Sequence, residues 1–167
     1  MEKPPADLGN RLLIAMDDTP GSLAMIRAAA RHLPDPAHTT ATLMHYLAPV
    51  YWEYGGGSPE TARYLAEQAH EEEQEEEALT LKYFSRAREI LKEAGVAHDH
   101  VQTKENWGAN SVTEAILSEL QAGAYTGVVI GRDHHDALAR LLHLDPAHAL
   151  RRHAEGIIVW VVDAPDD

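Results

Sequence analysis

Residues 12–22 read LLIAMDDTPGS, and this stretch decides the fold class because it joins a strand to a turn and a helix. The apolar run 12–16 predicts a buried strand, and the Asp, Thr, Pro and Gly that follow it are typical of a turn. From 22 to 33, apolar side chains recur at helical spacing until Pro34 stops the pattern. The stretch therefore predicts one strand–helix unit.

The rest of the chain repeats this alternation. Predicted strands cover residues 40–47, 98–103, 127–131 and 156–162, and predicted helices cover 59–94, 111–122, part of 136–144, and 145–153. Apolar strands that alternate with helices indicate a parallel sheet covered on both faces. Right-handed crossovers then give an α/β fold with a doubly wound, five-stranded parallel sheet. We expect a single domain over 11–163, with loose tails over 1–10 and 164–167.

The predicted helix over 59–94 changes character along its length. Its second half carries an apolar stripe, and Gly95 stands at the position typical of a helix end. The stripe consists of Leu79, Tyr83 or Phe84, Ala87 and Leu91. The acidic run 70–77, HEEEQEEE, has no apolar face, so we expect it to be solvated or to project from the body.

Composition excludes several classes of function. The 14 Lys and Arg against 27 Asp and Glu give a net charge of -13, so we expect neither nucleic acids nor membrane surfaces as partners. No apolar run reaches the roughly 20 residues of a spanning helix, and the N-terminus does not resemble a signal peptide. The absence of cysteine excludes disulfides, thiolate metal sites and a cysteine nucleophile. We expect a cytoplasmic protein.

Ligands of such sheets bind outside the carboxyl ends of the strands, where the winding direction reverses. The turn after the first strand offers Asp17 and Asp18, which are candidates to hold ribose hydroxyls or a metal. The alternative is that these turn residues only shape the turn and cap the next helix. The aromatic loop 51–57, YWEYGGG, is a candidate either to stack on a ligand or to cover a hydrophobic seam or a partner.

Other catalytic and metal-binding patterns are missing. The chain has no Walker lysine motif, no G-x-S-x-G elbow and no H-E-x-x-H helix. Its eleven histidines are dispersed, and His148 and His153 are five residues apart, so they do not share a helix face. We therefore predict neither a catalytic site nor a metal site.

The chain resembles the universal stress protein family. The resemblance rests on the strand that ends in Asp17, the glycine at the end of the fourth strand, RLL at 140–142, LRRH at 150–153, and the last apolar strand. It implies the fold of the adenine nucleotide alpha hydrolase-like proteins, with strand order 3-2-1-4-5. It also implies adenine-nucleotide binding in one branch and dimerisation through the fifth strand. The implied nucleotide-binding positions are Ala15, Met16, Asp17, Ile130, Gly131, His134, Leu144 and Asp145.

The nucleotide motif that the resemblance implies is degraded here. In nucleotide-binding members, the loop after the fourth strand follows G-x-x-G-x9-G-(S/T). Gly131 keeps the first glycine, whereas His134 and Leu144 replace the next two and Asp145 replaces the hydroxyl residue. Side chains then stand where phosphates would approach the backbone, and a carboxylate repels phosphate. We expect the triphosphate site to be lost.

We expect a stress-response or regulatory protein that is non-catalytic and has no cofactor. One alternative is a sensor that binds ATP or AMP through Asp17 and Gly131. A second alternative is a nucleotide hydrolase with Asp17 or His134 as the general base. The sequence identifies neither the stress nor any ligand or protein partner.

The last strand predicts self-association. In the implied order it lies at a sheet edge, and it has no Lys, Pro or inward charge to protect that edge from pairing. Pairing with the same strand of a second copy satisfies the free backbone groups about a two-fold axis. We therefore expect a homodimer, with Trp160 at or near the interface. The predicted interface residues are Ile157, Ile158, Val159, Trp160, Val161 and Val162.

Overall fold

The computed structural model describes residues 4–6, 8–46, 58–107, 109–132 and 157–163. Within them, five parallel strands form one sheet in the order β3-β2-β1-β4-β5, which confirms the predicted α/β fold. The strands are β1 (Arg11–Met16), β2 (Thr40–Tyr46), β3 (Val101–Asn106), β4 (Gly127–Gly131) and β5 (Ile158–Val162). The α-helices are α1 (Pro20–Ala30), α2 (Pro59–Glu93) and α3 (Val112–Ala122).

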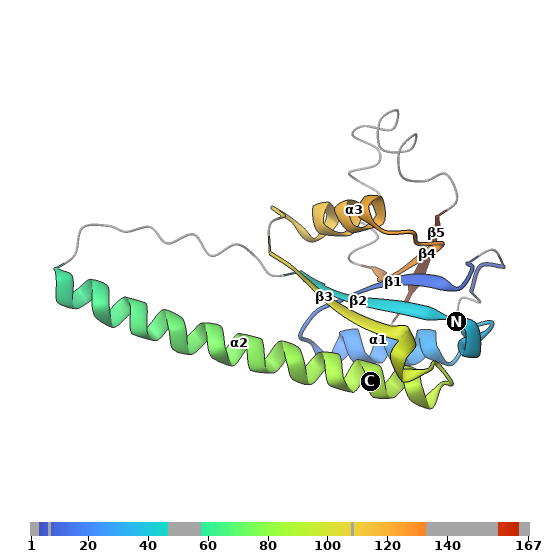
Figure 1. Ribbon diagram of the computed structural model, residues 1–167, viewed down its shortest axis with the longest axis horizontal. Helices are drawn as coiled ribbons and strands as arrows, with labels where there is room; N and C mark the ends of the chain where they lie inside the picture. Colours follow the sequence, from blue (N-terminus) through green and yellow to red (C-terminus); the bar gives the residue numbers. More distant parts are fainter. Residues whose placement is uncertain (1–3, 7, 47–57, 108, 133–156, 164–167) are drawn as a thin grey trace.

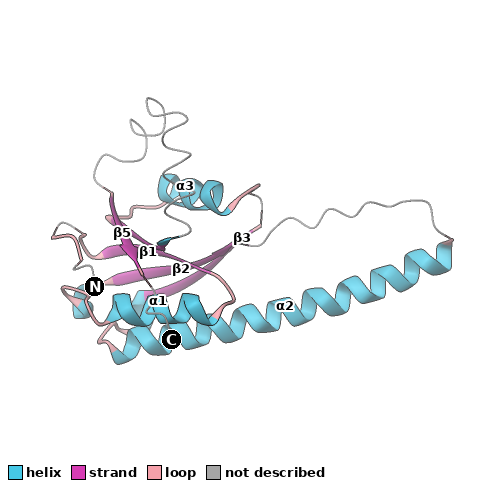
Figure 2. Ribbon diagram, turned by 180° about the vertical axis from the view of Figure 1, so that it is seen from behind, coloured by secondary structure: helices cyan, strands magenta, loops and turns pink. Residues whose placement is uncertain are grey.

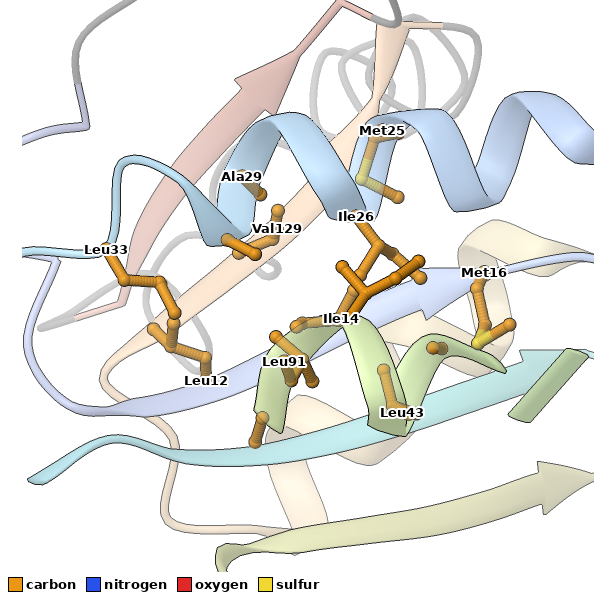
Figure 3. Close-up of a cluster of buried hydrophobic side chains, with 14 of the residues drawn as sticks. Leu12, Ile14, Met16, Met25, Ile26, Ala29, Leu33, Leu43, Leu91 and Val129 are labelled. Atoms are coloured by element: carbon orange, nitrogen blue, oxygen red, sulfur yellow. The ribbon is translucent and has the colours of Figure 1, made fainter. Parts of the chain in front are cut away.

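Helices cover both faces of the sheet (Figures 1 and 2). Side chains of α1 and α2 pack with Leu12, Ile14 and other strand residues in the larger hydrophobic cluster, which Figure 3 shows. Side chains of α3 pack with Leu13 and Ala15 in a smaller cluster on the opposite face. Alternate residues of β1 therefore serve opposite cores, as expected for a central strand.

Local sequence fixes where the helices begin and end. Thr19, Ser58 and Ser111 are the N-cap residues, and each side chain accepts a backbone N–H from the first turn of its helix. At the end of α2, Gly95 has φ 105°, the left-handed conformation that glycine adopts without strain. The N–H of Gly95 donates to the carbonyl of Lys92 and that of Val96 donates to Leu91, which completes a Schellman motif.

Three predicted boundaries were wrong. The predicted strand over 98–103 is a 3-10 turn (His98–His100) followed by β3, because Val101 is the residue that enters the core. The first helix ends at Ala30 rather than at residue 33. Ile157 precedes β5, so it is not a strand residue.

The apolar stripe of α2 begins one residue later than predicted. Leu79 is 42% exposed, whereas Thr80 is 1% exposed and packs with the face that Phe84, Ala87 and Leu91 continue. Every described residue of α2 before Thr80 is exposed or half-exposed, and in both ribbon views this part of the helix extends away from the sheet (Figures 1 and 2). The prediction of a projecting acidic section is confirmed.

Several predicted segments lie outside the described residues. They are the aromatic loop 51–57, the short helix within 136–144, the helix over 145–153, and Gly156. Among the residues that are described, no helix is long and apolar enough to cross a membrane.

Candidate functional site

The carboxyl ends of β1 and β4 lie side by side at the point where the sheet winding reverses. This arrangement brings the predicted positions Ala15, Met16, Asp17, Ile130 and Gly131 to one edge. The side chains of Ala15, Met16 and Ile130 are buried in the two cores, so only their backbone faces that edge. Among the described residues, a Cβ placed on Gly131 would meet no atom within 4 Å, and residues 133–156, which follow this strand, lie outside them.

Asp17 is held by its own turn. Its N–H donates to the hydroxyl of Ser22 at 3.0 Å, and its carboxylate accepts the hydroxyl of Thr19. The same Thr19 oxygen accepts the N–H of Ser22 at 3.2 Å, which caps α1. Within the described residues, the alternative that these residues shape the turn and cap the helix accounts for the hydrogen bonds of Asp17.

Asp18 turns inward and contacts two residues that sequence reasoning missed. One carboxylate oxygen accepts the hydroxyl of Thr80 at 3.3 Å, and the other lies 3.3 Å from Nε2 of His45. His45 is 5% exposed, and its ring and that of Phe84 form an edge-to-face pair with 6.3 Å between centroids. The sequence signal was weak, because His45 is one of three polar residues in the second strand and Thr80 stands beside the stripe of α2.

The described part of this edge is acidic. The last residue of each strand and the two that follow it include Asp17, Asp18 and Asp163 but a single basic residue, Arg132. The Arg132 guanidinium makes two hydrogen bonds of 2.7 Å to the carboxylate of Asp163. These bonds lower the pKa of Asp163, and they occupy the charged group that would otherwise attract a phosphate.

The other three predicted loop positions, His134, Leu144 and Asp145, lie outside the described residues. The loss of the triphosphate site, which these three residues predict, therefore stays a prediction from sequence. Within the described ranges, no group of three His, Asp or Glu side chains is arranged to hold a metal ion.

A second polar network lies under α3, and sequence reasoning also missed it. Glu119 is 6% exposed, and its carboxylate is 2.6 Å from Nζ of Lys104. The Tyr125 hydroxyl donates to the other oxygen of Glu119 at 2.7 Å. Burial, opposed by a hydrogen bond with Thr42 and assisted by Glu119, raises the pKa of Tyr125 to about 12. Gly123 makes room for this ring, since a Cβ there would stand 2.2 Å from it.

The fold and the edge together define a doubly wound α/β protein with its candidate site at the β1–β4 switch point. The model of the universal stress protein family matches residues 9–162. The chain belongs to the universal stress protein family.

Solved structures agree on the fold. One is a protein from the universal stress protein family from Burkholderia pseudomallei, with TM-score 0.57 and 16% identity, covering 96% of this chain and 100% of that one. Another is a universal stress protein in complex with cAMP, with TM-score 0.52 and 17% identity, covering 93% of this chain and 97% of that one. No curated protein matches the sequence significantly. These identities are low, so the structural likeness establishes the fold alone.

Proposed function

We propose that this protein is a non-catalytic, regulatory universal stress protein that acts in a stress response without binding ATP. The observation that carries the proposal is the charge at the β1–β4 edge. The aspartates there repel a polyphosphate, and Arg132, the basic residue of the described edge, is already paired with Asp163. The charge of the described edge disfavours a triphosphate, and Asp145 in the following loop adds a further carboxylate.

The second candidate function is a sensor that binds a nucleotide with a single phosphate. Gly131 supports it, because no described atom lies within 4 Å of the place that a Cβ would take, so a ligand can approach the backbone closely at the end of β4. One of the similar solved structures is a universal stress protein in complex with cAMP. In such a sensor, Asp17 would hold the ribose hydroxyls, either through Oδ2 or by exchanging the Thr19 hydroxyl that Oδ1 accepts.

Calorimetry separates these ligands. We expect no saturable heat with MgATP at sub-millimolar concentration, whereas micromolar binding of MgATP would overturn the proposal. Titrations with AMP and cAMP test the sensor, and Asp17→Asn is its matched variant because it keeps the shape of the side chain. Replacing His134→Gly, Leu144→Gly and Asp145→Ser together should restore some ATP affinity.

The absence of catalysis is tested by phosphate release. We expect no release from ATP above background in a clean preparation. Turnover that Asp17→Ala abolishes would show instead that the protein is a nucleotide hydrolase.

We further propose that the protein is cytoplasmic and that it forms a homodimer through β5. β5 is an edge strand of the described sheet, and Val159 is 38% exposed on it. Trp160, expected at the interface, is 3% exposed within the α1/α2 core, so it would contribute backbone groups rather than its ring. Light scattering at tens of micromolar should give at least a dimer mass. Val159→Pro, which removes a backbone donor, should lower that mass, and an unchanged mass would contradict pairing through β5.

A further inference from the structure

The long helix α2 consists of two halves of opposite charge. The projecting half, residues 59–79, which we call the arm, holds eight Glu and one Arg. The packed half, residues 80–93, holds four Lys and Arg and two Glu. Because glutamates four residues apart repel each other on a helix, the arm is a poor isolated helix, and its sequence suits a helix with a partner.

A groove of about 510 Å³ runs along the packed half, between α2 and the edge strand β3. Its lining includes Leu81, Phe84, Ser85, Arg88, Lys92 and Thr103. Leu81 is 58% exposed, and within the described residues neither Arg88 nor Lys92 forms an ion pair. Glu89 also lines the groove, but its carboxylate is paired with Arg86 at 2.8 Å. The groove therefore combines an exposed leucine with two free cations.

The groove residues on α2 continue as one line along the arm. The line alternates steps of four and three residues: Glu60, Tyr64, Glu67, Glu71, Gln74, Ala78, Leu81, Ser85, Arg88 and Lys92. Each of these residues is exposed except Arg88, which is half-exposed. Steps of four and three are the spacing of the contact seam in a coiled coil, so one accessible seam runs from the arm into the groove.

We propose that two copies of this chain pair through α2 in an antiparallel arrangement, with the arm of each lying in the groove of the other. A two-fold axis near Ala78 and Leu81 brings the two residues of each pair together. Glu71 then faces Arg88 of the second copy, Glu67 faces its Lys92, and Gln74 faces its Ser85. Symmetry makes each contact twice.

Charge selects a second copy in this orientation. A parallel pair would place the acidic arms against each other, which like charges oppose, whereas the antiparallel pair places each arm against Arg88 and Lys92. At the axis, Ala78 and the exposed Leu81 of both copies bury apolar surface. This interface is separate from β5, so either can exist without the other.

Cysteine cross-linking tests the register in the full-length chain, which has no cysteine of its own. We expect an oxidised mixture of the Gln74→Cys and Ser85→Cys variants to form a disulfide-linked pair, because antiparallel pairing brings these positions within reach. Glu72→Cys mixed with Ser85→Cys is the matched control, since Glu72 lies on the arm outside the seam. A yield roughly tenfold above the control supports the proposal, and an equal yield overturns it.

Charge exchange tests the ion pairs with the same readout. Adding Glu67→Lys and Glu71→Lys to the Gln74→Cys chain should lower the yield roughly tenfold, because the arm then meets like charge. Adding Arg88→Glu and Lys92→Glu to the Ser85→Cys chain should do the same. Combining both altered chains should restore the yield, and failure to restore it would overturn the proposed contacts.

Two further variants serve as controls, one for the charge change and one for pairing through β5. Glu72→Lys with Glu76→Lys makes the same charge change outside the seam and should leave the cross-link unchanged. Val159→Pro, which weakens pairing through β5, should also leave it unchanged. A cross-link that Val159→Pro abolishes in a folded chain would show that α2 has no interface of its own.

Discussion

The two faces of the sheet are held in different ways. On the α1/α2 face, apolar side chains from two helices and all five strands fill one cluster, with Leu91 and Ile26 fully buried. On the α3 face, the described cluster is smaller, and beside it lies the buried carboxylate of Glu119 with Lys104 and Tyr125. Packing dominates the first face, which also holds the contacts of Asp18 with His45 and Thr80, whereas on the second face a smaller cluster lies beside a buried ion pair.

The largest expected effect is on the α1/α2 face. Leu91→Ala should lower the free energy of unfolding by about 2–5 kcal/mol, because it leaves a cavity among close-packed side chains. Leu65→Ala on the arm, where the side chain is 53% exposed, should change the free energy by less than about 0.5 kcal/mol. Denaturant unfolding at low protein concentration measures both variants. Equal losses of unfolding free energy would show that the arm packs as firmly as the packed half of α2.

This contrast also shows what the sequence predicts well. Apolar runs and helical spacing predicted β1, β2, β4 and β5, both ends of α2 to within a residue and the projecting arm, because burial follows periodicity. The polar strand β3 begins three residues later than predicted. The β1–β4 edge followed from the same topology, since parallel strands end together. For the positions of these strands and helices, the hydrophobic pattern of the sequence and the tertiary packing agree.

The polar contacts could not be predicted in the same way. His45 and Thr80 stand inside apolar patterns, and their partner Asp18 comes from a distant turn. Glu119 reads as an exposed helix residue until Lys104 and Tyr125 are placed around it. The fold brings such residues to their partners, so the identity of a partner cannot be read from the local sequence pattern.

An intermediate effect is expected from the ion pair on the α3 face. Lys104→Met should leave the Glu119 carboxylate buried with only the Tyr125 hydroxyl beside it, at a cost of about 1–3 kcal/mol. Glu119→Gln should cost less, because the amide stays hydrogen-bonded to Tyr125 and Lys104 is 49% exposed to water. The same unfolding experiment compares the two variants. A greater loss of unfolding free energy for Glu119→Gln would show that an unpaired Lys104 is more costly than an unpaired Glu119 carboxylate.

The smallest expected effect is a pH dependence carried by Tyr125. Burial raises the pKa of its phenol to about 12, above the roughly 10 of an unfolded chain. A group with a raised pKa binds its proton more tightly in the folded state, so its contribution is complete below pH 10. This contribution is lost as the pH rises toward 12, where the phenolate would also face the Glu119 carboxylate.

Tyr125→Phe tests this pH dependence, because it keeps the ring on Gly123 and removes the titration. The free energy of unfolding of the native chain should therefore fall more steeply between pH 10 and 12 than that of the variant. Phenolate absorbance should show one tyrosine fewer titrating near pH 12 in the variant. Parallel curves would mean that the Tyr125 hydroxyl is solvated in the folded chain and that its titration does not affect stability.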